Sequence, residues 1–138
     1  MGRCNRRLVN IQAGGVMDYS KLCDVEINHA VASVLPGRYI TYPDHVMNSE
    51  TEEDFDPCNN AADAWPIISA NRISIEYDAE HQCDAPVEWV TAYGIDGLKV
   101  HLVAHQPCDK ALRSAMIVFL KMQESANVPV NPAGPDIR

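Results

Sequence analysis

The stretch KALRSAMIVFLKMQESA, residues 110 to 126, decides the fold of this chain. Apolar side chains point in most directions around the helix that it predicts, whereas a helix at the surface of a small domain needs only one apolar stripe. The stretch therefore predicts either a helix at the centre of the domain or a helix shared across a dimer interface. A small sheet covers one side of it, which leaves Ile117, Phe119 or Leu120 for a two-fold partner. In the alternative, helices at 24–35 and 64–70 cover that face within one chain.

Two further helices are predicted upstream. Ile27, Val31 and Val34 share one helical face, which indicates a helix over residues 24–35. The segment from Cys23 to Glu26 has the spacing of a capping box, and because a thiol accepts hydrogen bonds poorly we expect Asp24 to cap this helix.

The stretch CNNAADAWPII, residues 58 to 68, contains a proline where a helix should begin. A helix starting at Ala61 would place Pro66 in its second turn and cost about 3 kcal/mol. We therefore expect Asp63 to be the N-cap of a helix over 64–70, with Pro66 in the first turn. Asn71 is expected to end this helix in the left-handed conformation.

Alternating and β-branched residues predict strands at Tyr39–Tyr42 and Ile73–Tyr77, and a hairpin over 87–104 with Asp96-Gly97 as its turn. The segment 44–56 holds six acids and no Lys or Arg, which is typical of a solvated loop. Asp109 is the expected cap of the last helix. The sequence thus predicts an α+β fold, in which a small antiparallel sheet of about four strands packs against three helices.

The periodic pattern also sets the expected boundaries of the domain. Residues 1–16 read as a disordered leader or upstream extension, residues 17–130 as one domain, and residues 131–138 as a flexible tail. The 138-residue chain has a net charge of −8, which opposes direct binding to nucleic acid. Its apolar runs are too short for a membrane span. Five scattered cysteines without a CxxC motif indicate reduced thiols in a cytosol.

One group of residues has the chemistry of a metal site. His81, Cys83, His105 and Cys108 flank the predicted hairpin, and two His with two Cys could bind zinc or provide a Cys–His nucleophile. The HxC spacing is unusual for zinc, and no motif supplies an orienting group or an oxyanion site. We therefore expect no metal, no cofactor and no enzymatic activity, with a zinc protein or small hydrolase as an alternative.

A second group is suited to holding a ligand: Asn59, Asn60, Trp65, Arg72, Trp89 and Arg113. The indoles could stack on a base, and the guanidinium groups could clamp a phosphate or carboxylate. Each also has an ordinary structural role, because large aromatics such as these and Tyr93 fill cores, arginines form ion pairs with acids, and asparagines form turns.

Three segments together resemble a known family. DYSKLCDVEIN (18–28), CNNAADAWPIISANRISI (58–75) and KALRSAMIVFLKMQES (110–125) are similar to the NinX-type proteins of lambdoid phages and prophages, a family of unknown function. The resemblance implies a phage accessory protein in the cytoplasm of a bacterial host, and it supplies no substrate or catalytic residue. With it, the sequence favours a non-enzymatic protein that binds a host component, in counter-defence by sequestering a nucleotide or inhibiting a defence protein. An acidic inhibitor that mimics nucleic acid is an alternative.

Overall fold

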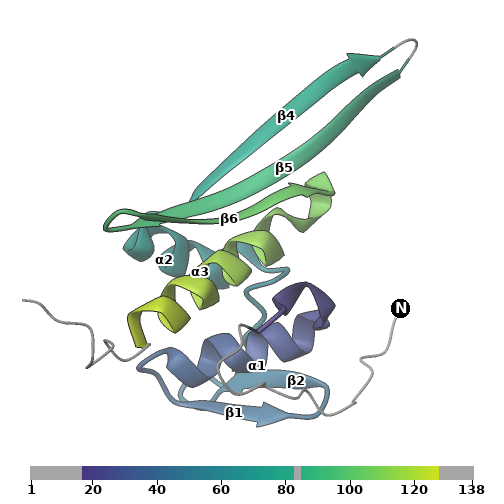
Figure 1. Cartoon of the computed structure of the whole chain (residues 1–138). Coiled ribbons are helices and arrows are strands. Elements are labelled where there is room, and N and C mark those ends of the chain that lie inside the picture. Colours follow the sequence, from purple (N-terminus) through teal and green to yellow (C-terminus); the bar gives the residue numbers. More distant parts are fainter. Residues whose placement is uncertain (1–16, 83–84, 128–138) are drawn as a thin grey trace, which may run out of the picture.

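A computed structural model of the chain describes residues 17–82 and 85–127. The predicted leader 1–16, the tail 131–138 and Cys83 lie outside the described residues. The helical elements are η1 (Tyr19–Lys21), α1 (Asp24–Val34), α2 (Ala61–Asn71), η2 (Cys108–Lys110) and α3 (Ala111–Asn127). The strands are β1 (Tyr39–Tyr42), β2 (His45–Asn48), β3 (Glu53–Asp54), β4 (Ser74–Gln82), β5 (Ala85–Asp96) and β6 (Lys99–Gln106). This mixture confirms the predicted α+β class (Figure 1).

The strands form two separate antiparallel sheets, β1-β2-β3 and β4-β5-β6, and the expected single sheet of four strands is wrong. The reason lies in the acidic segment 44–56, whose composition predicts a loop but which contributes β2 and β3. Val46 and Phe55 are buried there as isolated apolar anchors, too few to give an alternating pattern. Because β2 pairs with β1 directly after a two-residue turn, β1 joins this local sheet.

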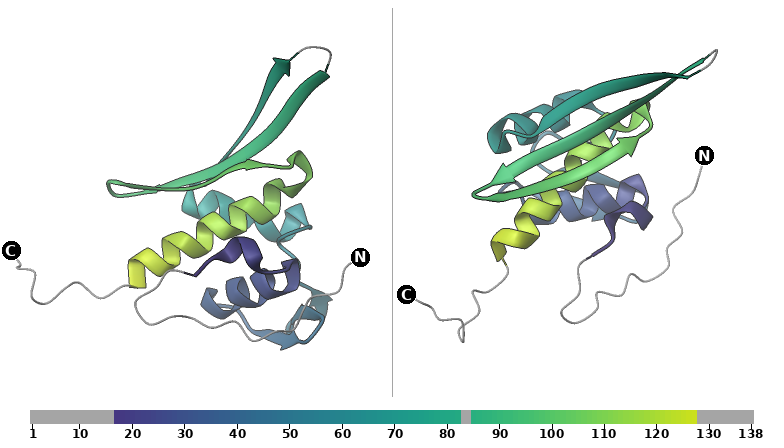
Figure 2. Two further views of the ribbon diagram at one scale, coloured as in Figure 1. Left: turned by 45° about the vertical axis from the view of Figure 1, so that its right-hand side comes forward. Right: turned by 45° about the horizontal axis from the view of Figure 1, so that its top comes forward.

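Helix α3 lies at the centre of the molecule (Figures 1 and 2). The sheet β4–β6 covers one side of it, α1 lies on the opposite side with the sheet β1–β3 beyond, and α2 packs alongside. Six successive residues from Ala115 to Leu120 are buried, which requires neighbours in every direction around a helix. The prediction of a central helix is confirmed. The apolar excess at Ile117, Phe119 and Leu120 is covered within one chain, so the argument for a dimer through this helix no longer holds.

Helix α2 begins three residues earlier than predicted, and the assignment of Asp63 as its cap is wrong. The N-cap is Asn60, whose side chain accepts a hydrogen bond from the Ala62 N–H at 2.9 Å. The Asp63 carboxylate instead accepts from the backbone N–H of Asp56, also at 2.9 Å. The early start buries Ala64 completely against the core. It places Pro66 inside the helix, where one backbone hydrogen bond is lost.

The left-handed residue at the end of α2 is Arg72, with φ of 56°, and not Asn71. Asn71 remains helical because its side-chain amide donates to the Ile67 carbonyl at 2.8 Å. The Ile73 N–H then donates to the Ile68 carbonyl at 3.0 Å, which closes the helix end and turns the buried Ile73 toward the core.

Three other local predictions need correction. Asp24 is the first residue of α1 and not its cap, because Cys23 is the N-cap and its N–H donates to Glu26 at 2.9 Å. Asp109 lies within η2 and does not cap α3. Asp96 pairs with Lys99, so the hairpin turn consists of Gly97 and the residue after it. The φ of 64° at Gly97 fits a type II′ turn, which requires a positive φ at its first central position.

Candidate binding surface

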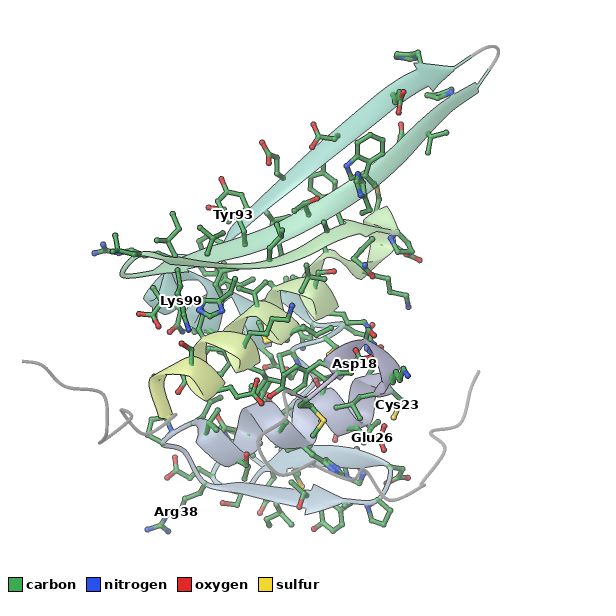
Figure 3. All side chains as sticks on the ribbon, viewed as in Figure 1. Asp18, Cys23, Glu26, Arg38, Tyr93 and Lys99 are labelled. Atoms are coloured by element: carbon green, nitrogen blue, oxygen red, sulfur yellow. The ribbon has the colours of Figure 1, made fainter. Side chains whose placement is uncertain are left out.

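The sheet β4–β6 is covered by α3 on one face only (Figure 2). On that inner face Val90 and Ala92 are fully buried. The backbone comes so close at Gly94 that an added Cβ would lie 2.7 Å from the sulfur of Met122. Because side chains alternate between the two faces of a strand, the residues next to these in β5 lie on the opposite face of the sheet. Tyr93 accordingly projects away from α3 (Figure 3).

We call this opposite side the outer face. It is formed by Ser74, Glu76, Asp78 and Glu80 on β4, Val87, Trp89, Thr91, Tyr93 and Ile95 on β5, and Val100 and Leu102 on β6. None of the elements within residues 17–82 and 85–127 packs over it.

The part of the outer face above α3 is apolar. Tyr93 is paired with Leu102, and Ile95 with Val100, so that four large side chains lie together. The exposed fraction is 61% for Ile95, 60% for Val100 and 48% for Leu102. Contiguous apolar surface on a small protein usually marks an interaction site. Among the described residues, most of the exposed large apolar side chains are therefore on this sheet and its turn, and none is on α3; the others are Val34, Ile40, Tyr42 and Trp65.

The hairpin β4–β5 extends past the end of α3 as a two-stranded projection (Figure 1). Strands β4 and β5 remain paired from Ser74↔Tyr93 to Gln82↔Ala85, whereas the regular pairing of β6 ends in a bulge next to Thr91. We call residues 76–82 and 85–91 the arm. The sequence predicts it only in part, because the strand expected at Ile73–Tyr77 continues to Gln82, where the alternation of RISIEY goes on through DAEH.

The arm carries a row of carboxylates beside a row of apolar side chains. Glu76 lies opposite Thr91, Asp78 opposite Trp89, and Glu80 opposite Val87. Residues 73–98 contain six acids and no Lys or Arg, so no cation within this segment can neutralise the row. The acidic residues are exposed on the edge strand β4, where a partner can reach them.

Trp89 is the one predicted ligand-binding residue that lies on the outer face. His105 contacts its ring edge-on, with ring centroids 4.9 Å apart and an angle of 66°. The bulge positions this imidazole, since His105 has a φ of 55° and its N–H donates to the Thr91 hydroxyl at 3.4 Å. The indole is thus half-buried and held in place on the arm.

Arg113 belongs to a different set of contacts, a polar junction beneath α1, α2 and α3. Its guanidinium donates to the Asp24 carboxylate at 2.8 Å and to the Leu22 carbonyl at 2.7 Å. The Asn59 amide donates to Asp24 at 3.1 Å and to Asp56 at 3.2 Å. We define this junction by Asp24, Asn28, Asp56, Asn59, Asp63 and Arg113.

The buried centre of the polar junction is Asn28. Its amide donates to Asp56 at 2.7 Å, and its carbonyl accepts from the backbone N–H of Cys58 at 3.2 Å. Burial and the nearby Asp24 carboxylate raise the pKa of the Cys58 thiol far above its ordinary range. The junction therefore holds a protonated thiol and a satisfied polar network, which together fix the positions of three segments far apart in sequence.

The remaining ligand-binding candidates are not brought together. Asn60 caps α2, and Arg72 occupies the left-handed position after it. Trp65 on α2 is 63% exposed, which makes its predicted place in the core wrong. Trp89 and Tyr93 are half-buried on the outer face and lie outside the core, so the same expectation is wrong for them. The described residues thus place Arg113 and Asn59 in the polar junction, and Trp89 on the arm.

A cavity of about 480 Å³ lies between η1, β6 and α3, and its lining includes Arg113 and Lys121. Both cations already have partners there, because Arg113 is paired with Asp24 and Lys121 donates to the Leu102 carbonyl at 3.0 Å. A phosphate would have to displace these contacts, and Asp18 on the same wall would repel it. This cavity is poorly suited to a nucleotide.

The alternative metal site is not assembled by the residues that are described. His81 lies opposite Pro86, whereas His105 lies next to Thr91, five positions along β5. At about 3.3 Å per residue the two histidines are roughly 16 Å apart along the strand. Within the described ranges, the His, Cys, Asp and Glu residues form no group of three or more that could hold a metal.

The cysteines differ from one another in state. Cys58 and Cys108 are free thiols. Cys23 is disulfide-bonded, which corrects the expectation that all thiols are reduced.

Comparison with known proteins decides the family. A family model described as Bacteriophage P22, NinX matches residues 18–123. The chain belongs to the NinX family. No curated protein and no solved structure matches it. None of the helices in the described part of this NinX-family protein is long and apolar enough to cross a membrane.

The three segments that resemble the NinX family contribute residues to the polar junction. Asp24 and Asn28 lie in the first segment, Asn59 and Asp63 in the second, and Arg113 in the third. Five of the six junction residues thus lie in the segments that carry the resemblance, and Asp56 precedes the second of them.

Proposed function

We propose that this NinX-family protein is a non-enzymatic phage accessory protein that binds a host protein through the outer face. The observation that carries the proposal is the uncovered apolar group of Tyr93, Ile95, Val100 and Leu102, continuous with the arm. Burying a large aliphatic side chain is worth about 1.5–3 kcal/mol. Four such residues can anchor an interface, and the carboxylates beside them give it charge specificity.

Protein binding fits these observations better than nucleotide sequestration. A nucleotide site needs a concave pocket with free polar groups that converge on phosphate and base. The cations of the cavity beside α3 are engaged in contacts with the protein itself, and the exposed face of the sheet is broad. The form of counter-defence that we propose is inhibition of a host defence protein, in the cytoplasm of the bacterium.

The test is a binding measurement with matched surface variants. Ile95→Thr/Val100→Thr removes apolar surface from the outer face while keeping β-branched residues that suit a strand. Ile40→Thr is the control, because Ile40 is an exposed strand residue of the other sheet. A host protein captured by the wild-type chain should then be purified and titrated. We expect the double variant to weaken its binding at least tenfold and the control to leave it unchanged. Equal binding by all three proteins would contradict the proposal.

A further inference from the structure

The outer face of the arm has two parallel rows of different chemistry. Glu76, Asp78 and Glu80 stand at alternate positions of β4, so their carboxylates recur about every 7 Å. The neighbouring row on β5 contains Trp89 and Val87, with Cβ atoms about 5 Å across from those of the acids. A line of negative charge therefore runs beside a line of apolar and aromatic groups.

A single nucleic-acid strand has the same two-row chemistry. Its phosphates form a line of negative charge, and its bases form an adjoining line of flat apolar surfaces. Proteins that bind single strands without sequence preference combine a cationic groove for the backbone with aromatic side chains on which bases stack. Carboxylates accept charge-assisted hydrogen bonds from Lys and Arg, as phosphates do.

The three carboxylates are available to a partner. Glu76, Asp78 and Glu80 form no ion pair or hydrogen bond through their side chains with another described residue. Other acids of the chain are used internally, as Asp24 is by Arg113 and Asp18 by Ser20. Trp89 also packs edge-on against the His105 ring, and a side chain already in contact with its own protein loses less entropy when it stacks on a partner.

We propose that the arm occupies the cationic, aromatic-lined groove of a host protein that binds single-stranded nucleic acid. This inference rests on the proposed function and names the chemical class of its partner. The carboxylate row takes the place of the phosphates, and Trp89 takes the place of a base. The protein thereby competes with nucleic acid for the groove and does not bind nucleic acid itself.

The experiment measures displacement from immobilised single-stranded DNA. Host proteins are loaded on single-stranded DNA cellulose at low salt, and increasing amounts of the full chain are added. We expect the wild-type chain to release a subset of the bound proteins. Glu76→Gln/Asp78→Asn/Glu80→Gln should require about tenfold more protein for the same release, because three exposed charge pairs are lost. Trp89→Ala should weaken release separately.

The matched control is Glu50→Gln/Glu52→Gln/Glu53→Gln. It removes the same charge from exposed acids before and within β3, which belongs to the other sheet. We expect it to release host proteins as the wild-type chain does. Equal loss of release in both triple variants would show that only net charge matters, and this would overturn the inference. Absence of release by the wild-type chain, or equal release from double-stranded DNA cellulose, would also overturn it.

Two other roles of the arm give different results. If the acids only keep the edge strand β4 from pairing with other chains, the arm variant will aggregate in light scattering while its monomeric fraction still releases host proteins. If a second copy of the chain covers the outer face, the wild-type chain will have twice the monomer mass and Ile95→Thr/Val100→Thr will restore the monomer without changing release. Either result overturns the inference. If a host partner is bound through Ile95 and Val100 but is not displaced by single-stranded DNA, the proposed function stands and the inference fails.

Discussion

The ion pair between Arg113 and Asp24 should be the strongest single polar contribution to stability in this domain. The exposed fractions of the two side chains are 15% and 29%, so both charges are largely removed from water. Arg113→Met keeps most of the aliphatic packing of the side chain and removes its charge. The change leaves the Asn59 amide as the side-chain partner of the Asp24 carboxylate among the described residues, and it removes a donor from the Leu22 carbonyl.

The magnitude follows from these losses. Removal of one partner from a buried ion pair costs about 3–5 kcal/mol, and the partial exposure of Asp24 places the expected cost near the lower end, at about 3 kcal/mol. Asp24→Asn keeps an oxygen acceptor and should cost about 2 kcal/mol. In the double variant neither charge is stranded, so its cost should be about 3.5 kcal/mol and the coupling energy about 1.5 kcal/mol.

Urea unfolding of the wild type, both single variants and the double variant would measure this cycle. The control is Lys21→Met, which removes a cation from the exposed pair with Asp18 and should change the free energy of unfolding by less than about 0.5 kcal/mol. If the costs of the two single variants add in the double variant, or if Arg113→Met costs no more than the control, the role given to the polar junction is refuted.

Three further changes test other parts of the structure. Gly94→Ala should destabilise the domain by about 1–2 kcal/mol in thermal unfolding, because its Cβ would meet Met122 and Val118, and Met122→Ala should offset part of this cost. Arg72→Gly should raise the free energy of unfolding by about 1 kcal/mol, since glycine adopts the left-handed conformation without strain, whereas Arg72→Val should lower it. Burial raises the pKa of Cys58 in the folded state, so its contribution to stability is complete below its ordinary thiol pKa and is lost as the pH rises above about 9. The free energy of unfolding should therefore change less with pH above about 9 in Cys58→Ala than in the wild type. If it changes equally in both proteins, the raised pKa of Cys58 is contradicted.

The central helix could be predicted from the sequence because the apolar pattern of its own residues indicates that it is buried on all sides. Apolar side chains from Ala115 to Leu120 point in all directions, and that pattern needs no knowledge of the neighbours. The start of α2 could not be predicted in this way. Asp63 has the chemistry of a cap, but the structure uses its carboxylate to hold the N–H of Asp56, and that contact depends on the turn before the helix. Asn60 is as good a cap as Asp63, and the prediction favours Asp63 only because it places Pro66 in the first turn and avoids the cost of a proline inside the helix, which the fold accepts.

The same limit applies to the candidate site. Asn59 and Arg113 have side chains that suit a ligand. In the structure the Asn59 amide donates to Asp24 and Asp56, and the Arg113 guanidinium donates to Asp24. Only a pairing between residues distant in sequence could reveal this use. The acid row of the arm, in contrast, is visible in the sequence as alternation beyond Tyr77. It was overlooked because polar residues in a strand with one solvated face resemble those of a loop.

The division between the polar junction and the outer face has a consequence for function. The three segments that resemble NinX provide the central helix and every junction residue except Asp56, but they contribute neither the acid row nor the apolar pairs above α3. The family match spans residues 18–123, the outer face included, and its description names no partner. Side chains of the outer face are free of such structural demands, because they touch no element that packs over the sheet in the described ranges. Under the proposed function, substitutions on the outer face can therefore change the partner without loss of the fold, and Trp89, the acid row and the residues beside them are the positions to test for partner recognition.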